Sequence, residues 1–498
     1  APTQADEDAF DYVRYRDVPK PNGIIGSVAH MVKGALGGGI LGGHVAYMKA
    51  GVYIALPLNF LFGLYMYYCL YILVTSAQKL YKRTRIPSMS YPDVGEAAMA
   101  CFPNPSVAKW STVFRYTIDA IICIDLFGAC ACYQLIIAKS VKQLVEDTPK
   151  VQIEGVGPGI LAGTWHLNLV RFAAGCITKV FKDEWRKMED GNFNDKFKFL
   201  FPGILVLGFE RYPELRVYLA AMIIPVVLIC LITHLKWLAP FSVVANLVIL
   251  FCIGMTTYYC IQKNPTFSNL EKANGLYSFF EYCGMAVFSM SCSGVVIPIE
   301  NNMKDPRKYP LVLTIGMSLI ILCTFLVSFF GYSAFLGASE SPITVNFPMD
   351  ILPKILKGGI ALMIYVTHAL NYWVPFNLVF YYIKAHHNQN KLLMWELIYR
   401  AIFVVLIGIV AIVFPDINAL MGFLGAFCLS NMAFIWPNMI YLMTVWQRPG
   451  LGKFKWRLWN SIFCISVGIF LLICGSVVNV NELRKVFVKE DVQRLMGH

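Results

Sequence analysis

Six glycines fall within the ten residues from Gly34 to Gly43, inside an apolar segment long enough to cross a membrane. Glycine in a helix interior costs roughly 1 kcal/mol relative to alanine, so this density favours a helix that breaks or one that packs very closely. In a bilayer, backbone groups that leave a helix are tolerated only where protein or a water-filled cavity satisfies them. Transporters use such broken helices to bind substrates and ions, whereas a packing face of small residues needs no ligand. This stretch alone leaves both interpretations open.

A second interrupted stretch runs from Phe288 to Met303. Small and hydroxylated residues occupy its centre, and Gly294 and Pro298 follow. Proline removes a backbone donor and clashes with the preceding helical turn. This stretch lies five expected spans after the first, and interrupted spans at corresponding positions of two halves point to a transporter binding site. The pair of interruptions therefore favours a ligand site over a packing face.

The composition is that of a polytopic membrane protein. Of the 498 residues, 57% are hydrophobic and 14% are charged, whereas a soluble domain carries about 25% charged residues. A span needs about 20 mostly apolar residues. Eleven segments meet this requirement: 24–50, 52–78, 112–140, 217–236, 239–262, 276–299, 310–337, 356–383, 396–414, 418–446 and 457–480. We therefore expect an all-α fold, with spans 1–3 in residues 24–140 and spans 4–11 in residues 217–480.

The order of the spans predicts an internal repeat. Spans 1–5 and 6–10 would form an inverted repeat with an eleventh helix added, because an odd repeat length forces opposite orientation. Lys and Arg gather before the first span and between the second and third, which predicts a cytoplasmic N-terminal segment, 1–23. With eleven spans, the tail 481–498 is then exoplasmic. The long, mixed-charge stretch 141–216 is expected to form an exoplasmic insert.

Catalytic and metal-binding patterns are absent from the sequence. There is no Walker A, HExxH or GxSxG motif, so we expect no enzyme, and any transport must be driven by a gradient. The fifteen cysteines mostly lie in apolar runs and form no CxxC pair, so we expect core residues rather than a metal or cofactor site. The net charge of +12 is interpreted as cytoplasmic-loop bias rather than affinity for nucleic acid.

The two interrupted spans resemble those of proton-coupled amino acid transporters in the amino acid/auxin permease group. The residues that carry the resemblance are His30-x-x-Lys33-Gly34-x-x-Gly37-x-Gly39-x-Leu41-Gly42 and Gly294-Val295-Val296-Ile297-Pro298-Ile299-Glu300-Asn301-x-Met303. The resemblance extends over nearly the whole chain from about residue 25, except 141–216. It implies a LeuT-like fold and symport of small neutral amino acids with protons, at the plasma membrane or an endolysosomal membrane. It also implies that His30 helps to handle the proton.

An amino acid zwitterion fits the chemistry of two helix breaks. N–H groups at a half-helix N-terminus would bind the carboxylate, and freed carbonyl groups at a half-helix C-terminus would bind the ammonium group. The resemblance implies that a tyrosine of span three closes over the ligand, although an ordinary packed aromatic explains that residue equally well. The expected ligand contacts are Gly34, Gly37, Gly38, Gly39, Tyr133, Ser291, Ser293 and Gly294.

Asp125 is an acidic residue in the middle of the third span. A carboxylate there costs about 3 kcal/mol on insertion scales and is a functional candidate by default. The family lacks an acid at this position, and we expect Asp125 to carry a proton in place of the acid that the family has at Ser291. Among other polar residues, Asp119 is a candidate for an ion pair with Arg115, and Glu300 for a structural charge at the inner mouth. His368 and Asn371 either line the cavity or pack.

Four departures from the family pattern keep a second function open. The family has a proline at His44, a Thr, Ser or similar at Gly38, and an acid–glycine pair at Ser291-Cys292. Its disulfide partner in the span-seven exit is replaced by Ala334, which leaves Cys176 without an obvious mate. We expect His44 to be a core histidine. The alternative function is an amino acid sensor or scaffold that keeps the transporter fold and transports little.

Overall fold

The structure is a computed structural model that describes residues 10–16, 21–146, 214–232, 241–262, 270–388, 391–446 and 448–485. The described residues are mostly helical, and one isolated bridge joins Asn22 to Met303. Most of the expected insert 141–216, with Cys176, and most of the tail 481–498 lie outside the described residues. The last helix continues to Lys485, beyond the expected end at residue 480.

Each expected apolar segment overlaps at least one helix within the described residues. The bounds of these helices are α2 (Ile24–Ala35), η1 (Gly38–Gly42), α3 (Gly43–Ala50), α4 (Val52–Thr84), α7 (Ser111–Glu146), α10 (Leu215–Cys230), α11 (Phe241–Gln262), α12 (Leu276–Met290), α13 (Ser293–Asn301), α14 (Tyr309–Phe335), α15 (Ile351–Ile383), α16 (Leu392–Val413), α17 (Ile417–Leu424), η10 (Gly425–Ile435), α18 (Trp436–Val445), α19 (Trp456–Phe470) and η12 (Leu471–Gly475). Two short helices, α5 (Tyr91–Ala100) and α6 (Pro105–Ala108), lie between α4 and α7.

The chain is an integral membrane protein with several apolar spans. Within its described part, eight helices are long and apolar enough to cross a membrane, or nine if the bent pair Ile24–Ala35 and Gly38–Ala50 is one span. The expected spans 217–236 and 239–262 fall on α10 and α11, whose apolar stretches Leu215–Cys230 and Leu247–Gln262 are shorter. The eleven-span, five-plus-five arrangement therefore remains a prediction.

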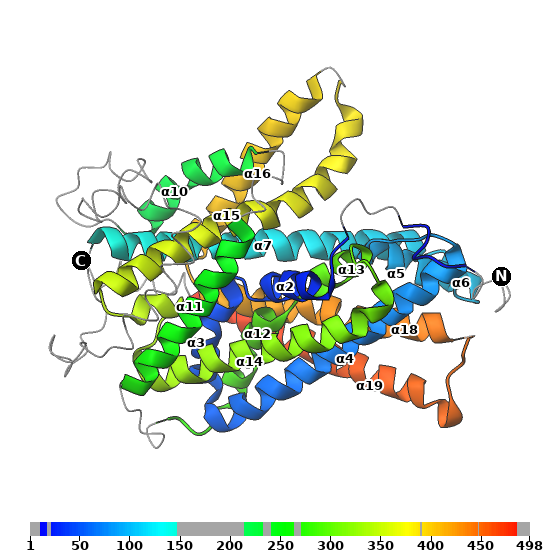
Figure 1. Cartoon of the computed structure of the whole chain (residues 1–498), viewed down its shortest axis with the longest axis horizontal. Helices are drawn as coiled ribbons and strands as arrows, with labels where there is room; N and C mark the ends of the chain where they lie inside the picture. The colour runs from blue at the N-terminus through cyan, green and yellow to red at the C-terminus, as the bar shows by residue number, and fades with distance from the viewer. Residues whose placement is uncertain are drawn as a thin grey trace.

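The two interrupted spans lie at the centre of the helix packing. α7 runs along the long axis of the molecule and packs along α15, while α10 and α16 lie together on one flank (Figure 1). On the other side of α7, α3 and η1 pack against α12 and α14, and α2 packs against α13 and α14. The elements that carry the candidate residues are thus in mutual contact.

Close backbone contact fixes α12 against the tenth expected span. Gly284 of α12 faces Gly422 of α17 and Gly425 of η10, and a Cβ added at Gly284 or Gly425 would overlap the opposing backbone. Small residues allow such close approach between helices in membranes. The tenth span continues from α17 through an eleven-residue π-helix, η10, into α18. Such π segments are rare and occur frequently at functional sites.

An ion pair joins the N-terminal segment to the end of α13. The Arg16 guanidinium contacts the Glu300 carboxylate at 2.9 Å, and the two side chains are 4% and 0% exposed. Arg16 also donates a hydrogen bond to the Pro87 carbonyl at 2.7 Å, and its guanidinium lies 5.1 Å and 5.2 Å from the ring centroids of Tyr12 and Tyr81. Burial, followed by the charge of Glu300, raises the pKa of Tyr12 to about 12. Glu300 is therefore a structural charge, as the sequence indicated, and its partner comes from the start of the chain.

We expect Arg16→Met to lower the free energy of unfolding by about 3–5 kcal/mol, because it leaves the buried Glu300 carboxylate without its cation. The matched control is Arg307→Met, which removes the cation from the Arg307–Asp11 pair, whose side chains are 65% and 47% exposed. In this control the free energy of unfolding should fall by less than about 1 kcal/mol. Unfolding of both purified variants in the same detergent measures the difference, and equal losses would contradict it.

Candidate functional site

The first expected span breaks between α2 and η1. α2 ends at Ala35, and Gly37 adopts an extended ψ of −142° that a helix does not allow. The 3₁₀ turn η1 then leads directly into α3, and the two halves meet at a bend of 46°. The glycine run therefore produces a broken helix, as the sequence predicted.

The sixth expected span breaks between α12 and α13. α12 ends at Met290, Ser291 is extended, and α13 begins at Ser293. The hydroxyl groups of Ser291 and Ser293 lie 3.0 Å apart, so the two candidate side chains hydrogen-bond to each other across the break. Ser293 is buried, whereas Ser291 keeps part of its surface accessible.

Glycines bring the two breaks together. A Cβ added at Gly39 would lie 2.9 Å from the Cα of Ser289, next to the end of α12. A Cβ added at Gly34 would lie 2.8 Å from the Val295 side chain, the neighbour of Gly294. The glycine run thus makes close contacts with its neighbour, as in a packing face, and does so at a break, as in a ligand site.

Tyr133 lies over the first break. It projects from α7, and its hydroxyl would be 2.8 Å from a Cβ added at Gly37, while its ring would be 2.8 Å from a Cβ added at Gly38. The Asn371 amide of α15 donates a hydrogen bond to the Tyr133 hydroxyl at 2.9 Å. Asn371 therefore belongs to the group of residues around the break.

His368 packs away from this group. Its ring is fully buried and contacts the Gln134 amide at 3.3 Å and the Cys230 thiol at 3.5 Å. These partners come from α7 and α10. For His368 the packing alternative holds.

The two proton candidates lie in different surroundings. His30 is exposed on α2, one turn before Gly34. Asp125 lies on the face of α7 that packs on α17 and η10, and its charge is close enough to the Cys428 thiol to interact with it. One Asp125 carboxylate oxygen is buried and has no hydrogen-bond partner among the described residues. A buried carboxylate oxygen without a hydrogen-bond partner is the less ordinary of the two observations.

Asp119 and Arg115 have other partners than the sequence indicated. Arg115 forms ion pairs with Asp93 at 3.1 Å and Glu96 at 3.0 Å, both from α5. Asp119 instead accepts a hydrogen bond from the Tyr382 hydroxyl at 3.2 Å.

His44 is a core histidine that holds a loop. Its ring is fully buried, its Nε2 lies 3.0 Å from the Glu340 carbonyl oxygen, and its Cβ packs on Gly331. The same loop accepts a hydrogen bond from the Lys139 ammonium group at the Ser341 carbonyl, 2.9 Å away. Within this loop, the backbone N–H of Glu340 donates a hydrogen bond to the side-chain oxygen of Asn346 at 2.9 Å. Sequence reasoning missed this loop, although its polar residues between two apolar spans were a signal for it.

A second missed contact joins the ends of α3 and α12. Lys49 forms an ion pair with Glu281 at 3.1 Å, and the Glu281 side chain is almost fully buried. The second half of the first broken span, α3, is thus joined to the first half of the other, α12. An acid at this depth in α12 was visible in the sequence as a charge inside an apolar segment.

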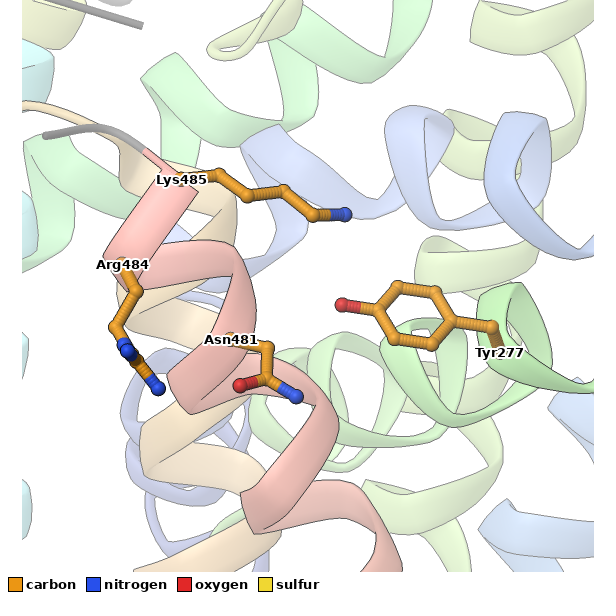
Figure 2. A pocket seen from close by; sticks show the side chains of 4 residues that line it. All are labelled: Tyr277, Asn481, Arg484 and Lys485. Atoms are coloured by element: carbon orange, nitrogen blue, oxygen red, sulfur yellow. The ribbon is translucent and has the colours of Figure 1, made fainter. Parts of the chain in front are cut away.

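A surface pocket lies apart from the breaks. It has a volume of about 350 Å³ and is lined by Tyr277, Asn481, Arg484 and Lys485 (Figure 2). Lys485 and Tyr277 point toward the same opening, where Lys485 already pairs with Glu482 and stacks on the Tyr277 ring. Within the described residues, no group of three His, Cys, Asp or Glu side chains has the geometry to hold a metal. The breaks therefore remain the candidate site.

Comparison with known proteins gives consistent matches over this architecture. The chain matches the model of a family described as transmembrane amino acid transporter protein over residues 20–170 and 192–480. It is 28% identical over 493 residues to the proton-coupled amino acid transporter-like protein pathetic of Drosophila melanogaster, covering 97% of this chain and 90% of that protein. It is 25% identical over 262 residues to the amino acid transporter AVT3C of Arabidopsis thaliana, covering 52% of this chain and 57% of that protein.

We expect Gly39→Ala to lower the free energy of unfolding by about 1–3 kcal/mol, because its Cβ would press on the backbone at Ser289. The control is Gly254→Ala in α11, where an added Cβ meets nothing within 4 Å. That change should be neutral or stabilise by up to about 1 kcal/mol through helix propensity. Unfolding midpoints of both purified variants test the contact, and a Gly39→Ala protein as stable as the wild type would refute it.

Proposed function

Because the chain belongs to the transmembrane amino acid transporter family, we propose that it is a secondary active transporter that symports small neutral amino acids with protons. Membership of the family supports amino acid transport. Coupling to a proton is supported by the similarity to a Drosophila protein named as proton-coupled amino acid transporter-like, and by an acid within a span that has one buried oxygen without a hydrogen-bond partner among the described residues. The observation that carries the proposal is the contact of two broken spans at Gly39 and Ser289.

The proposed substrate site lies between the two breaks. The N-terminus of α13 and the Ser291 hydroxyl are suited to a carboxylate, because both present hydrogen-bond donors. Gly37, Gly38 and Gly39 let the backbone approach the ligand, and Tyr133 covers it. The proposed substrate-binding residues also include Gly34, Ser293 and Gly294. Small amino acids suit this site because side chains already pack against most of the glycines.

The proposed mechanism is alternating access by two sets of contacts. Arg16 and Glu300 hold the end of α13 to the N-terminal segment. His44 and Glu340, with Lys49 and Glu281, hold α3 at the other end. Releasing one set while keeping the other opens the breaks to one side only. In this proposal the protein has eleven spans in a LeuT-like five-plus-five repeat, with a cytoplasmic N-terminus and an exoplasmic C-terminus, at the plasma membrane or an endolysosomal membrane.

The proposed proton carriers are Asp125 and His30. The Asp125 carboxyl group suits this role because a buried acid with an unpartnered oxygen has no fixed cation to keep it ionised. Loading a proton removes a charge from the interior of a span, which favours the motion of that span. His30 is placed one turn before the glycines and is accessible to water.

The alternative is an amino acid sensor with little transport. The contact of His44 with the Glu340 carbonyl favours it, because this contact fixes the outer half of the first span to a loop. Radiolabelled amino acid uptake into liposomes with an imposed proton gradient separates the two functions. Uptake that increases when the pH outside the liposomes is lowered supports the transporter. Saturable binding without uptake supports the sensor.

We expect Asp125→Asn to abolish gradient-driven uptake and to retain exchange of labelled for unlabelled amino acid at equal pH, because only the proton-carrying step is lost. The matched control is Asp119→Asn on the same helix, whose carboxylate already accepts a hydrogen bond from Tyr382. Asp119→Asn should keep its response to pH. Uptake by Asp125→Asn that still rises with outside acid would refute the role of Asp125.

A further inference from the structure

Tyr133 is fixed from two sides at the first break. Its ring lies against Gly38, where any side chain would come within 2.8 Å of the ring. Its hydroxyl accepts a hydrogen bond from Nδ2 of Asn371 at 2.9 Å. The two residues come from α7 and α15, which pack against each other (Figure 1). The tyrosine is 6% exposed, so little freedom remains for its ring.

The direction of this hydrogen bond decides what the hydroxyl still offers. A tyrosine hydroxyl carries one proton to donate and lone pairs that accept. Because the amide of Asn371 donates, the oxygen of Tyr133 is the acceptor and its own proton remains available. The same oxygen lies 2.8 Å from the position of a Gly37 Cβ, on the side of the helix break. The hydroxyl is thus a donor that faces the break.

We infer that Asn371 is a positioning residue for amino acid recognition, which fixes the Tyr133 hydroxyl as a hydrogen-bond donor to the carboxylate of the ligand. The inference rests on the proposed function, in which an amino acid binds between the two broken spans. A hydrogen bond to a carboxylate is stronger than one between neutral groups. Fixing the donor before the ligand arrives removes an ordering cost from binding.

Asn371 also has the accessibility that this role requires. It lies near the middle of α15 and keeps part of its surface accessible, as do Gly37 and Ser291. The amide therefore reaches the break rather than the packed interior around His368. The competing explanation is that Asn371 only joins α7 to α15. Asn377 offers the comparison, because its Nδ2 donates to the Trp373 carbonyl at 2.8 Å within the same helix.

The test is a double-mutant cycle of Asn371→Leu and Tyr133→Phe on the purified full chain, read by equilibrium binding of radiolabelled alanine. Each single change should weaken binding about tenfold or more, the loss expected for one hydrogen bond to a charged group. The double variant should bind as Tyr133→Phe does, because the amide acts only through the hydroxyl. Asn371→Gln, which keeps an amide donor, should recover part of the affinity, and Asn377→Leu should leave it unchanged.

Two further outcomes separate this inference from the proposed function. Additive losses in the double variant, or a loss with Asn377→Leu as large as with Asn371→Leu, would overturn the role of Asn371 and leave the transport proposal standing. Absence of saturable alanine binding by the wild-type chain would overturn the proposed substrate class and the inference with it. Saturable binding without uptake would refute symport, and the cycle would still decide the role of Asn371.

Discussion

The backbone N–H and C=O groups of a membrane span have to be hydrogen-bonded within the protein. The rest of this structure depends on two spans in which the regular helical hydrogen bonds are interrupted. At Gly37 and at Ser291 the chain leaves the helix in apolar surroundings, where an unpaired N–H or C=O group costs several kcal/mol. The first break is closed by a 3₁₀ turn, and the second by two serine hydroxyls in contact.

Two broken spans need supports, because half-helices are short and bury little surface on their own. The supports differ in kind at the two ends. Arg16 of the N-terminal segment forms a buried ion pair with Glu300, and its guanidinium also contacts two tyrosine rings and a backbone carbonyl. At the other end, His44 contacts a loop carbonyl. A buried pair adds little net stability compared with well-packed apolar residues, but removing one partner leaves the other charge buried and unpaired, so the two segments stay joined as a unit.

The proton-binding candidates differ in what their surroundings offer. His30 is accessible on α2, and its assignment rests on the resemblance of the motif around it. Asp125 lies inside the bundle, against the π-helix η10, with an unpartnered carboxylate oxygen. A charge in low dielectric is costly without a partner, so the protonation of Asp125 is coupled to the packing around it.

The sequence by itself determined the apolar helices and the two interruptions, because span length, glycine density and proline act on the local chain. It also identified Glu300 as a structural charge. It did not determine the partners of Arg115, Glu300, His44 or Tyr133, which lie on other elements, some of them hundreds of residues away. Closeness in sequence made Asp119 and Arg115 candidates for an ion pair. In the structure, Arg115 forms ion pairs with two acids on α5, and Asp119 accepts a hydrogen bond from Tyr382. Side-chain contacts of this kind depend on how whole helices pack, and only the tertiary structure decided them.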